Sequence, residues 1–332
     1  MQAIVADELG PPENYHLREC ALPEPAAGQA RVRIVATGVG YFDALMARGG
    51  YQVRPPVPFI PGSEFAGVVD SLGAGVQGVA SGQRVIGGCF GNAFAEYVCV
   101  DAATLLPLPD ALSFEAGSAF LVNYQTAVHA LMQRAALRSG ETVLVLGAAG
   151  GTGSAAVQVA KCLGARVIAG ASTADKRDFA LAAGADLALD YSEANWRDAL
   201  KAMTQGHGVD VVFDPVGGAL FEPAFRSLAW GGRHLVIGFA GGPIPKLPAN
   251  LPLLKGAALV GVDLRQSSFR DPAQHAANTR QLLAWVEAGA LRPPIGPVFP
   301  REAFREALAE AFSGKALGKV VLRIAPDEGA PA

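Results

Sequence analysis

A glycine-rich turn between an apolar run and a helical segment is the feature of this chain most suited to chemistry. The run Val143–Leu146 has the length and composition of a buried parallel strand, and Gly147, Gly150 and Gly153 follow it at once. A helical segment and a second apolar run, Arg166–Gly170, complete a unit of about 30 residues. Glycines in that context let backbone amides approach a pyrophosphate at the start of the helix. The pattern therefore predicts a dinucleotide site.

The residues after the second strand indicate which dinucleotide binds. A carboxylate normally ends this strand and accepts a hydrogen bond from the ribose 2′-hydroxyl of NAD. This chain has Ser172, Thr173 and Lys176 there, which supply the donors and positive charge that a 2′-phosphate requires. The pattern favours NADPH. On the alternative interpretation, Lys176 and Arg177 are ordinary solvated charges at the start of a helix.

The composition suits a protein with large cores and argues against several partners. The chain has 332 residues, 51% of them hydrophobic and 17% charged, and its net charge of −3 argues against a nucleic-acid partner. Its four cysteines form no CxxC pair, which favours free thiols in a reducing compartment. We find neither a basic leader with an apolar core nor an uncharged run of membrane-spanning length. We therefore expect a cytoplasmic protein with no membrane partner.

Two different patterns of elements must position these residues. Residues 1–120 are β-rich, with short runs such as Arg31–Val35 separated by Pro and Gly. A helical stretch over Ser113–Leu137 follows, with a break near Leu121–Asn123. From Glu141 onwards strands and helices alternate, which is typical of a doubly wound parallel sheet. We therefore predict an α/β protein with a β-rich domain and a doubly wound domain.

The alternating part predicts six strands, intervening helices and a final strand. The six strands are expected at 142–146, 165–170, 186–190, 209–214, 233–238 and 257–263. The helices and the last strand are expected at Ala174–Ala183, Ala194–Met203, Pro272–Ala288, Arg301–Phe312 and Lys319–Ile324.

Several motifs, in order along nearly the whole chain, resemble one family. They are Gly38–Asp43, Arg48–Tyr51, Pro58–Gly67, Gly82–Val85, Gly147–Gly153, Asp214–Gly218 and Gly318–Leu322. Together they resemble the medium-chain dehydrogenase/reductase superfamily, and within it the zinc-free quinone oxidoreductase branch. The resemblance implies a GroES-like domain of residues 1–120 with 267–332 and a Rossmann domain of residues 121–266. It also implies a homodimer in which the strand near Ala257–Asp263 pairs across the interface; alternatively, this strand only completes one subunit's sheet.

The resemblance also implies which residues contact the cofactor. Thr126 matches a position beside the nicotinamide, Tyr191 an aromatic residue on the adenine side, and Phe239 a position near the nicotinamide half. Thr126 and Phe239 could equally be packing residues. The full predicted set is Thr126, Gly150, Gly151, Thr152, Gly153, Ser172, Thr173, Lys176, Tyr191, Phe239 and Lys319.

The positions that hold zinc in the alcohol dehydrogenase branch carry other residues here. Tyr41 and Phe42 stand where that branch has a Cys-His pair, Ser63 replaces a histidine, and Cys89 and Cys99 stand alone. Because zinc needs three or four N, S or O ligands around one point, we expect no metal. Hydride transfer from a reduced nicotinamide to an electrophilic acceptor does not need this Lewis acid.

Tyr51 is the leading candidate for a catalytic side chain. Similar loops in quinone reductases and zinc-free enoyl-thioester reductases carry a tyrosine here, whose phenol could bind a quinone oxygen or protonate an α-carbon. Alternatively, Tyr51 packs at a domain edge. Asp43 is a second candidate, which could instead cap the short helix that begins nearby. Gly40 and Leu45 replace an Asn and a tyrosine found in family members, so we expect a roomier, more apolar pocket there.

These inferences converge on an NADPH-dependent, zinc-free reductase of a small electrophilic substrate, a quinone or a conjugated enone. The alternative enzyme is an enoyl-thioester or alkenal double-bond reductase. The alternative from another class is a non-catalytic NADPH-binding protein, since some relatives serve as lens crystallins or bind RNA. Turnover of NADPH distinguishes the two classes.

Overall fold

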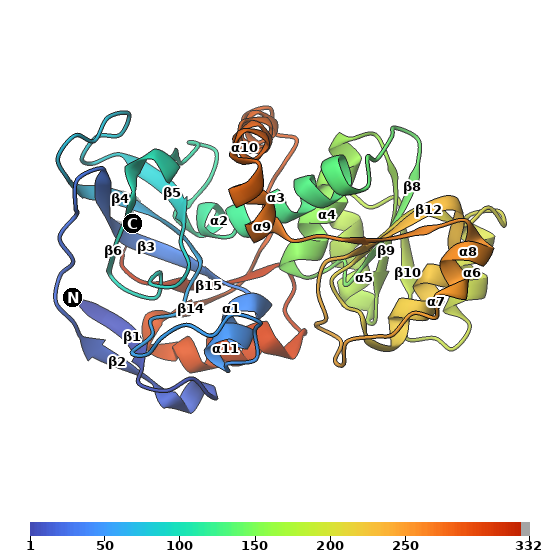
Figure 1. Cartoon of the computed structure of the whole chain (residues 1–332), viewed down its shortest axis with the longest axis horizontal. Helices are drawn as coiled ribbons and strands as arrows, with labels where there is room; N and C mark the ends of the chain where they lie inside the picture. Colours follow the sequence, from blue (N-terminus) through green and yellow to red (C-terminus); the bar gives the residue numbers. More distant parts are fainter. Residues whose placement is uncertain (327–332) are drawn as a thin grey trace. The chain divides into compact units, whose positions relative to one another are not determined.

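The computed structural model describes residues 1–326 and divides the chain into two compact units (Figure 1). Unit 1 combines Met1–Val122 with the segment that begins at Pro293, and unit 2 is Asn123–Arg292. Unit 1 is built on an antiparallel-rich sheet and unit 2 on a parallel sheet with helices, which confirms the predicted α/β fold class.

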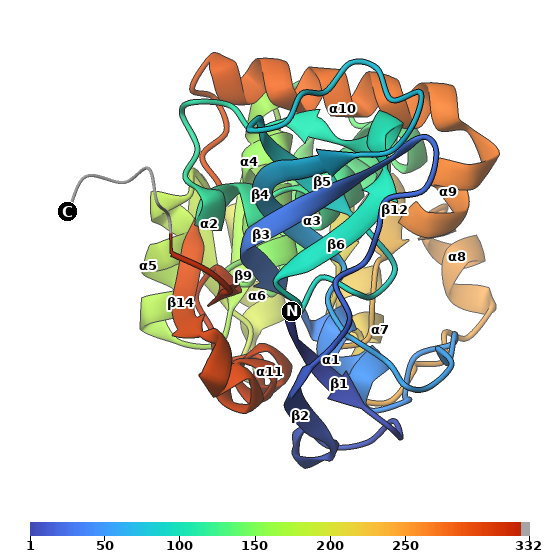
Figure 2. The same cartoon turned by 90° about the vertical axis from the view of Figure 1, so that its left-hand side faces the viewer.

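Unit 1 is built on a seven-stranded sheet with the order β14-β15-β3-β4-β5-β7, and β6 pairs with β3 (Figure 2). The strands are β3 (Gln29–Val39), β4 (Glu64–Leu72), β5 (Arg84–Gly88), β6 (Tyr97–Asp101), β7 (Leu106–Pro107), β14 (Ile295–Pro300) and β15 (Lys319–Arg323). Neighbours are antiparallel except β14 and β15. A separate antiparallel pair is formed by β1 (Gln2–Ala6) and β2 (Tyr15–Glu19).

The helices of unit 1 are α1 (Tyr41–Ala47), α2 (Phe114–Ser118) and α11 (Phe304–Ser313). Its short 3₁₀ turns are η1 (Pro12–Asn14), η2 (Ala102–Thr104) and η5 (Arg301–Ala303).

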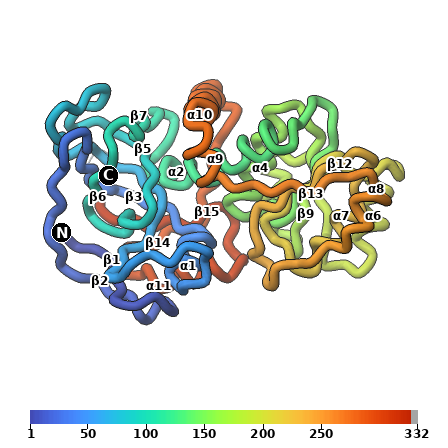
Figure 3. The backbone as a smooth tube through the Cα atoms, in the orientation of Figure 1, coloured from blue at the N-terminus to red at the C-terminus, as the bar shows by residue number. Residues whose placement is uncertain are grey.

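The C-terminal segment completes this sheet, as the red end of the tube in Figure 3 shows. β15 pairs with β3 from Val320 opposite Val39 to Arg323 opposite Ala36. Its alternating apolar residues reach the core that also contains Ile34 and Phe65. The predicted last strand is therefore confirmed to within one residue.

Unit 2 is a six-stranded parallel sheet with the order β10-β9-β8-β11-β12-β13. The strands are β8 (Thr142–Leu146), β9 (Arg166–Ala171), β10 (Leu187–Asp190), β11 (Val209–Asp214), β12 (Leu228–Val236) and β13 (Ala258–Gly261). Its helices are α3 (Leu121–Val128, which begins at the boundary between the units), α4 (Gly151–Cys162), α5 (Ala174–Ala182), α6 (Trp196–Met203), α7 (Phe221–Arg226), α8 (Asn250–Lys255), α9 (Leu264–Arg270) and α10 (Pro272–Glu287). A π-helical segment, η3 (His129–Arg134), continues α3, and a 3₁₀ turn, η4 (Gly218–Leu220), precedes α7.

This strand order is that of the doubly wound dinucleotide-binding fold. Figure 1 shows α4 and α5 on one face of the sheet and α6 and α7 on the other, as right-handed crossovers require. The six predicted strands and the predicted helices are confirmed, with ends that differ by a few residues. The helical stretch is interrupted at Ala119–Phe120, because α2 ends at Ser118 and α3 begins at Leu121; the break thus lies just before the predicted Leu121–Asn123, which belong to α3.

Residues 267–292 lie in unit 2, whereas the predicted boundary placed them with the first domain. The reason is the packing of α10 against α3 and η3. Gln125 Nε2 donates to Thr279 Oγ1 (3.0 Å) and Gln133 Nε2 donates to Asn278 Oδ1 (3.0 Å). Leu282 is fully buried. An apolar stripe in a sequence shows that a helix needs a partner, but not which domain supplies it.

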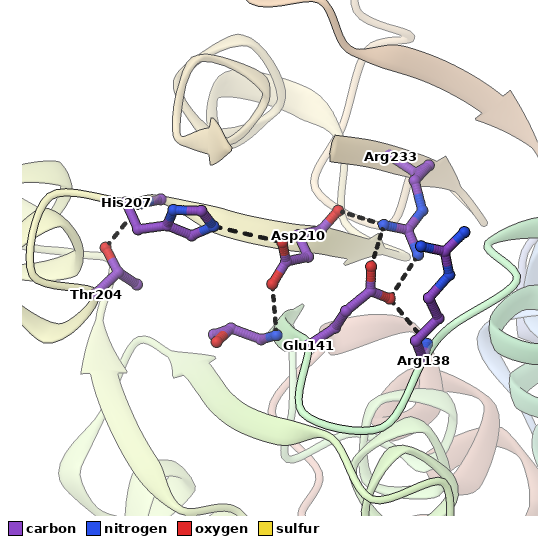
Figure 4. Close-up of polar contacts among 8 residues, drawn as sticks. Arg138, Glu141, Thr204, His207, Asp210 and Arg233 are labelled. Atoms are coloured by element: carbon purple, nitrogen blue, oxygen red, sulfur yellow. Dashed lines mark hydrogen bonds and ion pairs between the residues drawn. The ribbon is translucent and has the colours of Figure 1, made fainter. Parts of the chain in front are cut away.

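The amino-terminal edge of the unit 2 sheet is joined by polar side chains (Figure 4). Arg233 at β12 donates from Nη1 and Nη2 to the two carboxylate oxygens of Glu141 (2.9 and 2.8 Å). Asp210 at β11 accepts a hydrogen bond from the Thr142 amide of β8 (2.8 Å). These contacts connect β8, β11 and β12 near this edge and leave the opposite, carboxyl edge open to loops.

Candidate cofactor and substrate residues

The glycine turn folds as a close-packed bend between β8 and α4 in unit 2. Gly147 has φ +60°, a left-handed conformation that favours glycine. A Cβ on Gly153 would lie 2.1 Å from the Gly147 carbonyl oxygen, so only glycine fits there. Gly150 is the N-cap of α4, which begins at Gly151. The first amides of a 12-residue helix therefore stand at the carboxyl edge of the sheet, as a pyrophosphate site requires.

Thr152 and Thr126 lie on two helices, α4 and α3, that side-chain hydrogen bonds connect. Thr152 Oγ1 donates to Asn123 Oδ1 (3.0 Å), which ties the first turn of α4 to the first turn of α3. Tyr124 on α3 donates to Gln158 Oε1 on α4 (2.9 Å). Thr126 lies two positions beyond Tyr124 and is half-buried. The structure thus places Thr126 on a helix docked to the glycine turn.

The end of β9 carries the residues predicted to select the cofactor. Thr173 is the N-cap of α5, and its hydroxyl accepts a hydrogen bond from the Lys176 amide (3.4 Å). Ser172 precedes it and forms a hydrogen bond with the Tyr191 phenol. Burial raises the pKa of Tyr191, and the hydrogen bond with Ser172 works in the opposite direction. Ser172, Thr173, Lys176 and Tyr191 therefore gather at one corner of the sheet.

Asp190 also belongs to this corner, although no sequence motif pointed to it. It ends β10, where it lies opposite Ala171 of β9. Arg177 Nη1 lies 2.6 Å from Asp190 Oδ2, and the Ser192 amide donates to Oδ1 (2.9 Å). Hydrogen bonds from Ser192 and the charge of Arg177 lower the pKa of Asp190. Because the carboxylate belongs to the neighbouring strand, reading along β9 alone could not find it.

The turns after β11 and β12 form a second corner of the same edge. Asp214 ends β11, and Oδ1 accepts hydrogen bonds from the Val216 and Gly217 amides (2.8 and 2.7 Å). Phe239 follows β12 and packs so closely on Gly217 that a Cβ there would lie 3.0 Å from Phe239 Cδ1. Phe239 is half-buried and follows the carboxyl end of β12, and its predicted place near the nicotinamide stays a prediction.

In unit 1, Asp43 is buried and fully engaged. Oδ2 accepts a hydrogen bond from the Gly40 amide (2.8 Å) in the capping box of α1, and the Ser63 hydroxyl donates to Oδ1 (2.7 Å). Burial raises the pKa of this carboxyl, while the Lys319 charge and the two hydrogen bonds oppose that effect. The helix-capping interpretation of Asp43 thus has a direct geometric basis.

A buried ion pair lies beside Asp43. Lys319 Nζ is 2.6 Å from Glu64 Oε1, with side chains that are 5% and 1% exposed. Glu64 Oε2 accepts a hydrogen bond from the Val122 amide (3.0 Å). Lys319 is therefore a buried residue of unit 1, and its predicted contact with the cofactor stays a prediction.

The space beside Gly40 is occupied, contrary to the expectation of a roomier pocket. A Cβ on Gly40 would lie 3.0 Å from Lys319 Nζ and 3.2 Å from Asp43 Oδ2. Leu45 is likewise packed, because a Cβ on Gly50 would meet its Cδ1 at 2.9 Å. The residue types at Gly40 and Leu45 could not show that Lys319 of β15 occupies this space, because β15 is far away in the sequence.

The donor set in this part of unit 1 does not fit zinc. Within residues 1–326 no group of three or more His, Cys, Asp or Glu side chains is arranged to hold a metal ion. Lys319 places a positive charge against Glu64, and Asp43 already accepts two hydrogen bonds. Burial, together with the Asp43 and Glu64 charges, raises the pKa of Cys89, which disfavours the thiolate that zinc binds.

Tyr51 packs against Phe42 and keeps a polar end. The two rings meet edge to face with centroids 4.6 Å apart, and Gln52 Nε2 donates to the phenol oxygen (3.4 Å). The side chain is partly buried at the margin of the unit 1 core. Both earlier interpretations, a packing residue and a hydroxyl available for chemistry, are compatible with this position.

Comparison with known proteins agrees with this architecture. Residues 26–110 match the alcohol dehydrogenase GroES-like domain family, and residues 151–279 match the zinc-binding dehydrogenase family. The chain is 38% identical to quinone oxidoreductase-like protein 2 of Rattus norvegicus over 325 residues, which cover 97% of this chain and 92% of that protein.

Two solved structures are also similar over nearly the full length. The quinone oxidoreductase of Thermus thermophilus, which was also solved in complex with NADPH, has 36% identity and a TM-score of 0.82, covering 98% of this chain and 100% of that one. An NAD-dependent alcohol dehydrogenase has 30% identity and a TM-score of 0.89, with the same coverage.

The GroES-like unit, the Rossmann unit and these similarities define an oxidoreductase of the class that uses a nicotinamide cofactor. The glycine cradle at the start of α4 fits such a dinucleotide. The chain belongs to the medium-chain dehydrogenase/reductase superfamily, as a member similar to the quinone oxidoreductases.

Proposed function

We propose that this protein is an NADPH-dependent, zinc-independent reductase that transfers hydride to a quinone. The observation that carries the proposal is the corner at the end of β9. Ser172 and Thr173 stand where an NAD site has its acid, and the neighbouring Asp190 is paired with Arg177. A 2′-phosphate at this corner meets hydroxyl donors and the Lys176 charge, and Arg177 pairs with the adjacent Asp190 carboxylate.

Different residues of this chain have different roles in the proposed reaction. The bound nicotinamide supplies a hydride, which together with one proton converts a quinone to a hydroquinone. Gly151 and Thr152 present the first amides of α4 to the pyrophosphate. Lys176 pairs with the 2′-phosphate, and Tyr51 gives the proton to the reduced acceptor.

The donor set of unit 1 supports a reaction without zinc. The positions that bind the metal in the alcohol dehydrogenase branch hold Phe42 and Ser63, and the adjacent Glu64 is paired with Lys319. A quinone is electrophilic already, so hydride transfer to it does not require a Lewis acid.

The exposed face of β12, α8 and β13 supports a homodimer. β13 pairs with β12 alone, so its other edge is unpaired within the described chain. Large apolar side chains beside it are exposed, among them Trp230 (81%) and Leu253 (78%), with Leu254 and Leu259 less so. A sheet edge flanked by apolar side chains suits pairing with a second copy.

The location of the protein stays a prediction. No helix in the described part of the chain combines the length and apolar character needed to cross a membrane. The cytoplasmic assignment rests on the sequence features given above.

An NADPH-oxidation screen with quinones, enones and enoyl thioesters tests the reaction, and Tyr51→Phe tests the proton donor. We expect quinones to be the best acceptors and Tyr51→Phe to lower kcat about 100-fold. Tyr97→Phe, a second tyrosine of unit 1 that lies beside Arg31, is the matched control and should turn over normally.

Three outcomes contradict parts of the proposal. NADPH binding without oxidation of NADPH by any acceptor would support the non-catalytic binding protein. Faster turnover of enoyl thioesters than of quinones would support the double-bond reductase. A Tyr51→Phe enzyme as fast as the wild type would assign protonation to solvent.

A further inference from the structure

The turn after β11 is held by one carboxylate. Asp214 is 1% exposed, and its Oδ1 accepts the Val216 and Gly217 amides at 2.8 and 2.7 Å. A carboxylate that accepts two backbone amides of the following turn closes that turn in a single conformation. Gly217 and Gly218 have φ +64° and +57°, so the chain bends sharply here.

The second oxygen of this carboxylate is held by a buried histidine of the next strand. His234 Nε2 on β12 lies 2.9 Å from Asp214 Oδ2, and the histidine is fully buried. An ionised carboxylate only accepts, so the tautomer of His234 that pairs with an Asp214 carboxylate is the one that donates from Nε2. The ring packs against Phe221 and Phe225 of α7, with centroids 4.5 and 6.0 Å away.

The other ring nitrogen of His234, Nδ1, lowers the free energy of unfolding, because it is a polar atom buried without a hydrogen-bond partner within the described chain. Buried polar atoms are nearly always paired, and an apolar side chain would fill this position between two phenylalanines without the cost. Departures from local packing rules concentrate at functional sites. We therefore attribute the presence of a histidine at position 234 to the contact between its Nε2 and Asp214 Oδ2.

The turn that Asp214 closes contacts the glycine turn on one side and the segment after β12 on the other. A Cβ on Gly147 would lie 3.0 Å from Val216 Cγ2, so Val216 packs against the glycine turn. On the other side, the Val216 carbonyl accepts a hydrogen bond from the Gly241 amide (2.7 Å), and Gly217 lies against Phe239. A shift of the Val216–Gly217 turn would therefore displace the Gly147 turn on one side and Phe239 on the other.

We propose that His234 is a positioning residue for cofactor binding: through its bond to Asp214 it sets the Val216–Gly217 turn, which seats the Gly147 turn on one side and Phe239 on the other. The inference rests on the proposed function only in taking NADPH as the ligand of this edge. It assigns His234 no contact with the cofactor or the acceptor.

Two side chains of matched length test this role. Glutamine places an amide nitrogen where Nε2 lies, and methionine fills similar space without a donor. We expect His234→Gln to bind NADPH within about threefold of wild type and His234→Met to raise the Kd at least tenfold, measured by NADPH fluorescence. Hydrogen–deuterium exchange at Val216 and Gly217 should be accelerated by methionine and not by glutamine. His207→Gln, an exposed histidine at the opposite sheet edge, is the control and should change neither.

The results distinguish failure of the proposed function from failure of the positioning role of His234. A wild-type protein that binds no NADPH refutes the proposed function, whereas tight wild-type binding with equal binding by His234→Met refutes the positioning role. Equal losses of Tm in both variants with unchanged affinity would make His234 merely structural. If His234→Met does not fold, His234→Phe retains an aromatic ring between Phe221 and Phe225 and removes the donor, with the same expected loss of affinity.

Discussion

At the residue scale, single atoms decide what the carboxyl edge of unit 2 can bind. Gly153 allows α4 to begin against the Gly147 carbonyl, and a side chain there has no room. Arg177 pairs with Asp190, which offsets the charge of an acid that would oppose a 2′-phosphate. The first contact shapes a general dinucleotide turn, and the second supports the proposed preference for the phosphorylated cofactor.

Lys176→Ala should separate the two cofactors. Loss of a charge-assisted hydrogen bond costs about 1.5–3 kcal/mol, so the Kd for NADPH should rise roughly 10- to 100-fold. NADH lacks the 2′-phosphate, and its affinity should stay within about twofold. Titration calorimetry with both cofactors measures the difference, with Lys201→Ala, on an exposed face of α6, as the control. Equal losses for NADPH and NADH would refute the phosphate assignment.

Gly153→Ala should destabilise the protein far more than Gly150→Ala. The added Cβ would meet the Gly147 oxygen at 2.1 Å in the first case and at 3.6 Å in the second. We expect about 3 kcal/mol of lost unfolding free energy at Gly153 and a change within about 1 kcal/mol at Gly150. Urea denaturation without cofactor measures both, and similar values would show that the turn yields without strain.

At the element scale, the two edges of the unit 2 sheet have different tasks. The carboxyl edge carries the turns and helix starts of the predicted site, whereas the amino edge is closed by Arg233, Glu141 and Asp210 (Figure 4). Arg233 also donates to the Ala135 carbonyl (2.9 Å) and thereby holds the end of η3. The contacts at the amino edge thus hold in place the strands whose carboxyl ends carry the turns of the predicted site.

Arg233→Ala should lower the unfolding free energy by roughly 2 kcal/mol at neutral pH, because it leaves Glu141 half-buried without its cation. Burial alone would raise the pKa of Glu141, but hydrogen bonds from Arg233 and the Arg138 amide lower it below its ordinary value of 4.5. A lowered native pKa stabilises the fold above the ordinary value, and this stabilisation is lost as pH falls through the native value. The difference between wild type and Arg233→Ala should therefore shrink below about pH 4.5.

Denaturation at pH 7 and at pH 3.5 measures this effect. Lys246→Ala is the control, because it removes an exposed cation on the loop between β12 and α8 that is not among the groups acting on Glu141. A difference that is the same at both pH values would show that Arg233 acts through packing rather than through charge.

At the scale of the whole molecule, one chain builds its first unit from both of its ends. β15 enters the sheet beside β3, and it carries Lys319 to the buried Glu64. Unit 2 is continuous in sequence, and β13 leaves one unpaired edge within the described chain. Assembly is therefore expected through unit 2.

Trp230→Ser combined with Leu253→Ser should shift a dimer towards monomer. Both side chains are exposed beside β13, and a stable interface of this kind needs its central aromatic and aliphatic anchors. Sedimentation velocity over a concentration series measures the shift. Leu22→Ser, an exposed leucine of unit 1, is the control. A wild-type protein that stays monomeric at high concentration would refute the dimer.

Local patterns predicted the elements well because their causes are local. The apolar run at β8, the glycines after it and the helix α5 each depend on residues within a short stretch of sequence, and each is in the structure where the sequence predicted it. The position of α10 could not be predicted in the same way, because its partners Gln125 and Gln133 lie far away in the sequence.

The sequence by itself determined the class of fold, the glycine turn and the residue types that we propose face a cofactor phosphate. Only the tertiary structure decided which charges meet: Arg177 with Asp190, Lys319 with Glu64, and His234 with Asp214. Hydrogen-bonding and hydrophobic periodicity act between near neighbours and can be read along a chain. Pairing of buried charges depends on which strands become adjacent. The glycine turn therefore indicated a cofactor site, and the neighbouring strands determined its electrostatics.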